Sequence, residues 1–169
     1  GLGPLREEFG TALRKNTNLQ KYEVVLPGGI ELDILVAHYS NPGIAIERVI
    51  HLTVPLDGYR VLRPEALLVL KLCAWLDRTA RPKGVKDEID ILSVLVSVQI
   101  DWEAFRALTV QCASAYYAQM PGVMHRVLES ADRRKTWARV LRNGAPAFSN
   151  EHAWRAALAQ LKVQLPRDI

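Results

Sequence analysis

The sequence predicts an α+β protein with a small sheet lobe, residues 1–63, followed by a helical lobe, residues 64–169. Strand-forming residues surround a Pro-Gly-Gly turn in the first lobe, which is typical of a β-hairpin. From Pro64 onward the apolar residues recur at helical spacing. Strands followed by helices indicate the α+β class, and a content of 49% hydrophobic and 24% charged residues is that of a globular chain.

The first lobe is expected to begin with an amphipathic helix over residues 4–15, because apolar residues recur there about every 3.6 positions. A hairpin follows, with strands over residues 22–26 and 30–36 joined by the Pro-Gly-Gly turn. We expect a third strand over residues 48–56 and a short strand at residues 61–62.

The second lobe is expected to contain five helices, separated by Pro and Gly residues. Their expected ranges are 64–79, 85–98, 102–119, 123–142 and 149–163. Pro64 suits the first turn of a helix, and Asp101 is a typical N-cap for the third one.

Composition excludes several classes of protein. The longest apolar run, residues 66–76, is shorter than the ~18 residues of a membrane span, so no membrane partner is expected. The two cysteines, Cys73 and Cys112, fall in apolar helical patterns, which predicts a reducing compartment and a cytoplasmic location. The net charge of +4 is concentrated in the second lobe and favours an anionic ligand there, but it is too small to establish nucleic-acid binding. Lack of a Gly-x-x-x-x-Gly-Lys-Ser/Thr motif argues against a Walker-type ATPase.

Two acids fall inside the second hairpin strand, where acids are uncommon. Glu31 and Asp33 share one face of this strand, opposite a row of apolar residues. A carboxylate in such a position is solvated, paired or bound to a metal. The residues alone therefore leave two interpretations open, a solvated sheet face and a metal site.

Cations and acids also interrupt the first two helices of the second lobe. Lys71 lies in a helix that is apolar nearly all round, and Arg78 follows seven residues later on the same stripe. This pair indicates either a phosphate site or a lysine that extends to solvent. Lys86, Asp87 and Asp90 share one face of the next helix. The acids are expected either to stabilise the helix start or to hold Lys71 or Arg78 in place for a phosphate.

Taken in this order, these segments resemble the nucleotidyltransferase superfamily, and within it the minimal and AbiEii-like nucleotidyltransferases of bacteria. The resemblance covers residues 5–98 and lies in four places: Ile30-Glu31-Leu32-Asp33-Ile34-Leu35, the run from Leu62 to Trp75 with Lys71 inside it, Arg81, and the Lys-Asp-x-x-Asp pattern over residues 86–91. It implies a mixed sheet with helices behind it. It also implies transfer of a nucleotide from a nucleoside triphosphate (NTP) to an acceptor hydroxyl, with two Mg²⁺ or Mn²⁺ ions held by three carboxylates.

The resemblance assigns a role to each of these residues. Asp33 becomes the catalytic carboxylate and, with Glu31, a metal ligand. The nucleotide-binding cations are Lys71, Arg78 and Lys86, and the acids that position them are Asp87 and Asp90. The hypothesis requires Asp33 and Lys71 to face one groove.

The family's Gly-Ser…Asp-x-Asp motif does not occur in the sequence. One expectation is that the motif lies before residue 1. The other is that the motif is missing and the chain is a non-catalytic binding or regulatory protein of the same fold. A third hypothesis is a nucleic-acid-binding helical module. Its basic residues are Arg126, Arg133, Arg134, Lys135, Arg139 and Arg142. The acceptor is left open between a small molecule, an RNA and a protein, and the oligomeric state is left open too.

Overall fold

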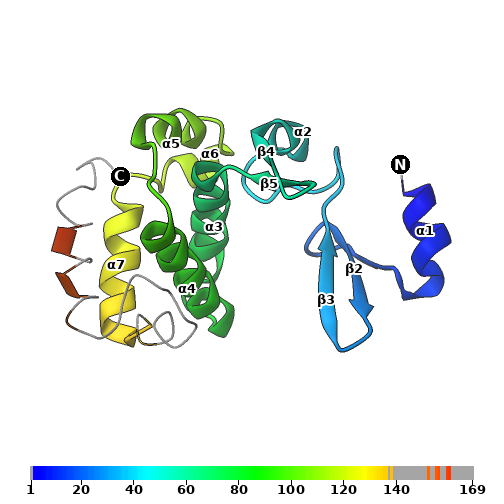
Figure 1. Ribbon diagram of the computed structural model, residues 1–169, viewed down its shortest axis with the longest axis horizontal. Coiled ribbons are helices and arrows are strands. Elements are labelled where there is room, and N and C mark those ends of the chain that lie inside the picture. Colours follow the sequence, from blue (N-terminus) through cyan, green and yellow to red (C-terminus); the bar gives the residue numbers. More distant parts are fainter. Residues whose placement is uncertain (1, 137, 139–151, 153–154, 157–158, 161–169) are drawn as a thin grey trace. The chain divides into compact units, whose positions relative to one another are not determined.

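The computed structural model describes residues 2–136, 138, 152, 155–156 and 159–160 (Figure 1). Its helices and two small antiparallel sheets confirm the α+β class. Every described strand pair is antiparallel, so the mixed sheet implied by the resemblance is not among them. The chain divides into two compact units between His51 and Leu52, whereas the sequence places the boundary at residues 63/64. The contacts assign the short hairpin before Pro64 to the helical unit.

The first unit contains the predicted hairpin, which is confirmed. Its strands are β2, Lys21–Leu26, and β3, Ile30–Ile34, and Leu26 pairs with Ile30 across the turn. Gly28 and Gly29 both adopt positive φ, 86° and 78°, which glycine tolerates without strain. The register places Glu23 opposite Asp33, and this pairing determines the surroundings of the predicted catalytic acid.

The helix predicted over residues 4–15 is wrong in its second half. Helix α1, Gly3–Phe9, ends where Gly10 turns to φ 49°, and the 3₁₀ turn η1, Gly10–Ala12, follows. The chain then forms β1, Arg14–Asn16, which pairs with β2 and extends the sheet to the order β1-β2-β3. Pairing to an available strand edge therefore outweighs the local helical pattern at Arg14.

The strand predicted over residues 48–56 is helical at its start. Helix α2, Ile46–Val49, and the 3₁₀ turn η2, Ile50–Leu52, precede β4, Thr53–Leu56. Ile46 and Val49 are both buried, and their spacing of three places them on one face of a helix. Strand β4 pairs with β5, Tyr59–Leu62, through a two-residue turn, Asp57-Gly58, in which both residues have positive φ.

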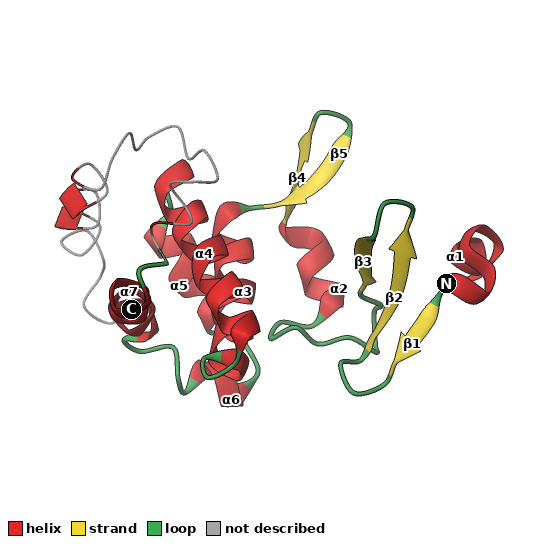
Figure 2. Cartoon of the chain, turned by 90° about the horizontal axis from the view of Figure 1, so that it is seen from below, coloured by secondary structure: helices red, strands yellow, loops and turns green. Residues whose placement is uncertain are grey.

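The second unit is built on a pair of long helices, α3, Pro64–Arg78, and α4, Pro82–Ser97. Helix α3 packs against α4 and against α5, Trp102–Thr109, and α4 also contacts α7, Val123–Arg134 (Figure 2). The fully buried side chains of this core include Leu68, Leu72, Ile91, Leu92, Phe105, Met124 and Leu128. The Asp101 N-cap is confirmed, because its carboxylate accepts hydrogen bonds from the N–H groups of Glu103 and Ala104, both at 3.0 Å.

The helix predicted over residues 102–119 is divided in two. Helix α5 ends at Thr109, and the short helix α6, Ser114–Tyr117, begins after a turn. This turn brings Cys112 into the core, where its Sγ lies 4.0 Å from that of Cys73, and both thiols are free. The hydrogen bond with Cys112 and burial raise the pKa of Cys73. Burial of the sulfur outweighs continuation of the helix here.

The predicted fourth helix is shorter than expected. Helix α7 ends at Arg134, and Lys135 adopts a left-handed conformation with φ 53°. Arg139 and Arg142 lie outside the described residues, as does most of the predicted helix over residues 149–163. Among the described helices, none is both long and apolar enough to cross a membrane.

Candidate functional site

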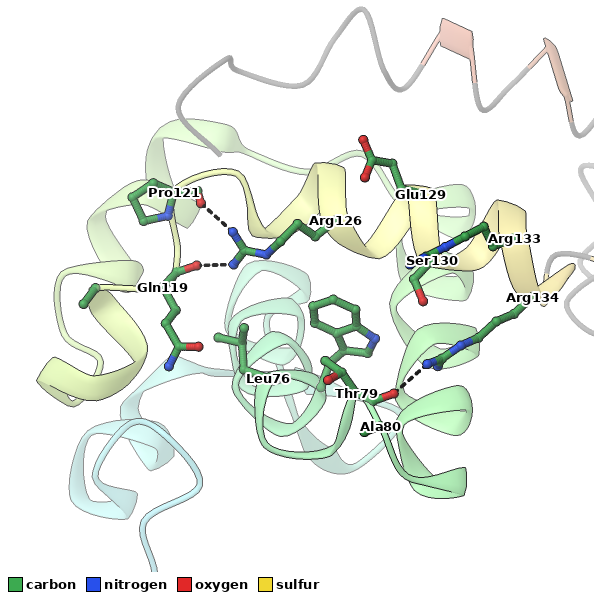
Figure 3. Close-up of a pocket in the computed structure, with 12 residues that line it drawn as sticks. Leu76, Thr79, Ala80, Gln119, Pro121, Arg126, Glu129, Ser130, Arg133 and Arg134 are labelled. Carbon is green, nitrogen blue, oxygen red and sulfur yellow. Dashed lines mark hydrogen bonds between the residues drawn. The ribbon is translucent and has the colours of Figure 1, made fainter.

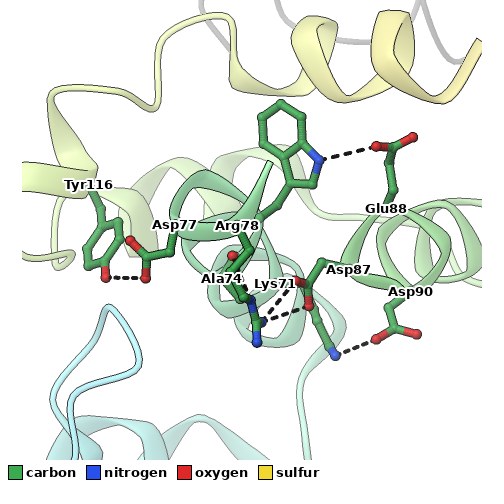
Figure 4. Close-up of polar contacts among 9 residues, drawn as sticks. Lys71, Ala74, Asp77, Arg78, Asp87, Glu88, Asp90 and Tyr116 are labelled. Carbon is green, nitrogen blue, oxygen red and sulfur yellow. Dashed lines mark hydrogen bonds and ion pairs between the residues drawn. The ribbon is translucent and has the colours of Figure 1, made fainter. Parts of the chain in front are cut away.

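Two ion pairs join α3 to α4 (Figure 4). Lys71 Nζ lies 2.5 Å from Asp90 Oδ2, and one terminal nitrogen of Arg78 lies 2.9 Å from each carboxylate oxygen of Asp87. Lys71 and Arg78 are seven residues apart on α3, so the two cations lie about two helical turns apart on one face. The structure therefore brings together four of the residues predicted to form the nucleotide site, as two specific pairs.

Exposure differs between the cations and one of their acids. The side chains of Lys71 and Arg78 are 30% and 33% exposed, so both can meet a ligand from solvent. The Asp87 side chain is only 5% exposed. Burial raises the pKa of Asp87, although the positive charges of Arg78 and Lys71 oppose this. Lys86 is exposed at the start of α4 and makes no ion pair among the described residues.

The pH dependence of stability tests the buried Asp87 carboxyl. Because its pKa is raised in the folded state, the folded chain holds this proton more tightly than the unfolded chain. Stability from this group is present at low pH and is lost as pH rises through the folded pKa. The unfolding free energy of wild type minus that of Asp87→Asn should therefore fall as pH rises from the ordinary pKa of an aspartate through the raised pKa of folded Asp87. Urea unfolding at a series of pH values measures this difference. A difference that rises with pH would show that the attraction of Arg78 outweighs burial.

Asp33 lies on β3 in a separate ion-pair cluster within the first unit. Lys21 Nζ lies 2.7 Å from Asp33 Oδ1 and 2.8 Å from Glu23 Oε1. Partial burial lowers the pKa of Lys21, but its hydrogen bonds to Asp33 and Glu23 outweigh this and raise the pKa above its ordinary value. The ammonium is therefore charged, and it bridges the two carboxylates.

This arrangement does not fit the two metal ions implied by the resemblance. The Lys21 ammonium lies where a cation bridging Glu23 and Asp33 would lie. Glu31 is exposed and is paired in register with Val25, not with another acid. In the part of the chain that the structure describes, no three His, Cys, Asp or Glu side chains are grouped to hold a metal. Two-metal catalysis needs clustered carboxylates, so no catalytic step follows from Asp33 and Glu31.

Asp33 and Lys71 each have a counterion in their own unit. Asp33 pairs with Lys21 in the first unit, and Lys71 pairs with Asp90 in the second. The charge of Lys71 on α3 is therefore paired within the second unit, and the charge of Asp33 on β3 is paired within the first. The single groove required by the sequence hypothesis remains a prediction.

A buried acid, Glu88, was not singled out from the sequence. Its side chain is fully buried and accepts hydrogen bonds from four side chains. The donors and their distances are Trp75 Nε1 at 3.4 Å, Ser130 Oγ at 2.9 Å, Arg134 at 3.1 Å and Thr136 Oγ1 at 3.0 Å. A signal was present, because Glu88 falls on the same helical face as the buried residues Ile91, Leu92 and Leu95.

A cavity of about 790 Å³ lies beside this acid in the second unit (Figure 3). Helix α3 and the residues after it contribute Trp75, Leu76, Thr79 and Ala80 to its lining. Helix α7 contributes Arg126, Glu129, Ser130, Arg133 and Arg134. Three of the six basic residues behind the nucleic-acid hypothesis therefore line a concave pocket.

Comparisons with known proteins identify no relative of this chain. No family model, no curated protein and no solved structure matches the chain. None of these comparisons therefore bears on the resemblance noted from the sequence, which stays a prediction.

Proposed function

We propose that this chain is a nucleotidyltransferase-type protein, similar to the AbiEii-like proteins of bacteria, whose helices α3 and α4 bind the triphosphate of an NTP. The observation that carries the proposal is the pair of partly exposed cations on one face of α3, Lys71 and Arg78, each held by a carboxylate of α4. Cations that are already positioned lose little conformational freedom when they bind a phosphate.

The two cations suit different parts of a triphosphate. The planar guanidinium of Arg78 presents several N–H donors to phosphate oxygens, whereas Lys71 acts as a compact charge. Arg78 also donates from Nε to the carbonyl oxygen of Ala74 at 3.1 Å, which restricts the rotation of its guanidinium. With Lys86, three cations outnumber the two acids Asp87 and Asp90, so the face as a whole attracts an anion. Mg²⁺ or Mn²⁺ bound to the NTP would neutralise part of the phosphate charge.

Transfer of the nucleotide to an acceptor hydroxyl is the reaction that the resemblance implies. It requires carboxylates besides Asp33, and the described residues do not group them. A second candidate function is therefore a non-catalytic nucleotide-binding or regulatory protein of the same fold. The bridge from Lys21 to both Glu23 and Asp33 favours it, because the ammonium takes the place of a metal. The acceptor would be a small molecule, an RNA or a protein.

A cytoplasmic location is part of the proposal. NTPs and a reducing environment are both available there. The free thiols of Cys73 and Cys112, 4.0 Å apart, are consistent with reducing conditions.

Lys71→Met tests the nucleotide site. We expect ATP or another NTP, with Mg²⁺, to bind about tenfold or more weakly to the variant, the effect of losing one charged hydrogen bond. The unfolding free energy should change by less than about 1 kcal/mol, because the Lys71–Asp90 pair is partly exposed. Calorimetry with the four NTPs measures the affinity.

Arg48→Met is the matched control, since it also removes one positive charge but lies exposed on α2. It should leave NTP affinity within about twofold of wild type, an effect well under 1.4 kcal/mol. A folded Lys71→Met protein with unchanged affinity would overturn the proposal. Release of pyrophosphate from a bound NTP supports the transferase, and binding without release supports the non-catalytic protein.

A further inference from the structure

The cavity beside Glu88 has two chemically different walls. On the α3 side the lining includes Trp75, Leu76 and Ala80, which are mainly apolar. On the α7 side it includes three arginines, Arg126, Arg133 and Arg134 (Figure 3). A volume of about 790 Å³ falls in the range of cavities that enclose small molecules. Such a pocket suits a ligand with an anionic end and an apolar or planar body.

Two of the arginines are held in place by the protein. Arg126 donates to the carbonyl oxygens of Gln119, at 2.5 Å, and Pro121, at 3.1 Å. Arg134 donates to the carbonyl oxygen of Thr79, at 2.6 Å, and to Glu88. A guanidinium has five N–H donors, so each keeps donors for a ligand while its position is already fixed.

Arg133 differs from its two neighbours. It is exposed, lines the cavity and has no hydrogen bond or ion pair to any described residue. It follows Arg126 by seven residues, which places both on one face of α7. Arg133 is therefore available for an anion that enters between the two held arginines.

One acid opposes the three cations. Glu129 lines the same cavity three residues after Arg126 and four before Arg133, so it lies within reach of both on the helix surface. The buried Glu88 forms an ion pair with Arg134 and compensates its charge, which leaves Arg126 and Arg133 against Glu129. The lining thus carries a net positive charge, and the charge of Glu129 reduces it.

We propose that this cavity binds a small phosphomonoester with a planar or apolar body, of the kind represented by a nucleoside monophosphate. The phosphate lies at Arg133 between the guanidinium groups of Arg126 and Arg134, since arginine donors match phosphate oxygens. The body lies against Trp75, Leu76 and Ala80. This site shares no residue with the proposed NTP site on α3 and α4, so either proposal can fail without the other.

The test uses AMP as the probe, with affinity measured by calorimetry on the full chain. Arg133→Gln should weaken AMP binding about tenfold, because it removes the unpaired cation. Glu129→Gln should strengthen it by about threefold, because Glu129 is the only acid among the described residues that line the cavity. Opposite effects from two neighbouring α7 residues would not follow from a loss of structure, and circular dichroism confirms that each variant is folded.

Two further variants locate the site. Lys135→Gln removes an exposed charge that follows α7 and does not line the cavity, so it should change AMP affinity by less than about twofold. Arg48→Met, which removes an exposed charge on α2, should likewise leave AMP affinity within about twofold of wild type. Inorganic phosphate should bind more weakly than AMP, because it lacks the body.

Three results would overturn the proposal. The first is no saturable binding of AMP. The second is an equal loss of affinity in Arg133→Gln and Lys135→Gln, which would indicate general attraction to a basic surface. The third is tighter binding of a single-stranded RNA without terminal phosphates than of AMP, with a steep dependence on salt. This result would assign α7 to nucleic-acid binding.

Discussion

Glu88→Ala is expected to lower the free energy of unfolding by about 3–5 kcal/mol, as is typical when one partner of a buried charged network is removed. The carboxylate is fully buried and accepts hydrogen bonds from Trp75, Ser130, Arg134 and Thr136. Alanine leaves these donors without their acceptor, and three of them belong to buried residues. Urea unfolding monitored by circular dichroism measures the change.

Glu103→Ala provides the control, since Glu103 is exposed in the first turn of α5. Its effect should stay within about 0.5 kcal/mol, the usual range for a surface substitution. The loss of unfolding free energy in Glu88→Gln should lie between those of Glu88→Ala and Glu103→Ala, because glutamine keeps one acceptor oxygen but turns an amide group toward the donors. A loss below about 1 kcal/mol for Glu88→Ala would contradict the network's role in stability.

Gly84→Ala is expected to cost about 2–3 kcal/mol or more, although alanine favours a helix over glycine by about 1 kcal/mol. Gly84 lies in α4, and a Cβ there would be 2.2 Å from the carbonyl oxygen of Arg78 and 2.8 Å from its carbonyl carbon. Both atoms belong to the backbone, so the end of α3 must move. Thermal and urea unfolding measure the loss.

Gly3→Ala is the matched control, because Gly3 is also helical and a Cβ there meets nothing within 4 Å. This variant should be unchanged or stabilised, by up to about 1 kcal/mol. Because the added Cβ of Gly84→Ala displaces the backbone of Arg78, this variant should also weaken NTP binding. A Gly84→Ala protein as stable as wild type would show that α3 and α4 can separate at low cost.

The elements with strong local signals could be predicted from the sequence. The Pro-Gly-Gly turn predicts the β2–β3 hairpin, Pro64 marks the start of α3, and Asp101 caps α5. Helix α2 and the division between α5 and α6 could not be predicted in this way. Both depend on burial in the folded chain, of Ile46 in the first case and Cys112 in the second, and tertiary contacts of this kind override local preference.

The candidate site was predictable as a set of residues but not as a set of contacts. Helical spacing places Lys71 and Arg78 on one face of α3, and Asp87 and Asp90 on one face of α4. Which acid meets which cation depends on how α3 and α4 align, and this is a tertiary property. The role of Lys21 depends in the same way on the pairing of Glu23 with Asp33 across two strands.

Neighbouring acids of α4 serve two different parts of the second unit. Asp87 holds Arg78 of α3, and Glu88, the next residue, holds Arg134 of α7. A small rotation of α4 about its own axis would therefore move both guanidinium groups together, the one proposed to contact a triphosphate and the one that borders the AMP cavity. A single peptide unit mechanically links the two.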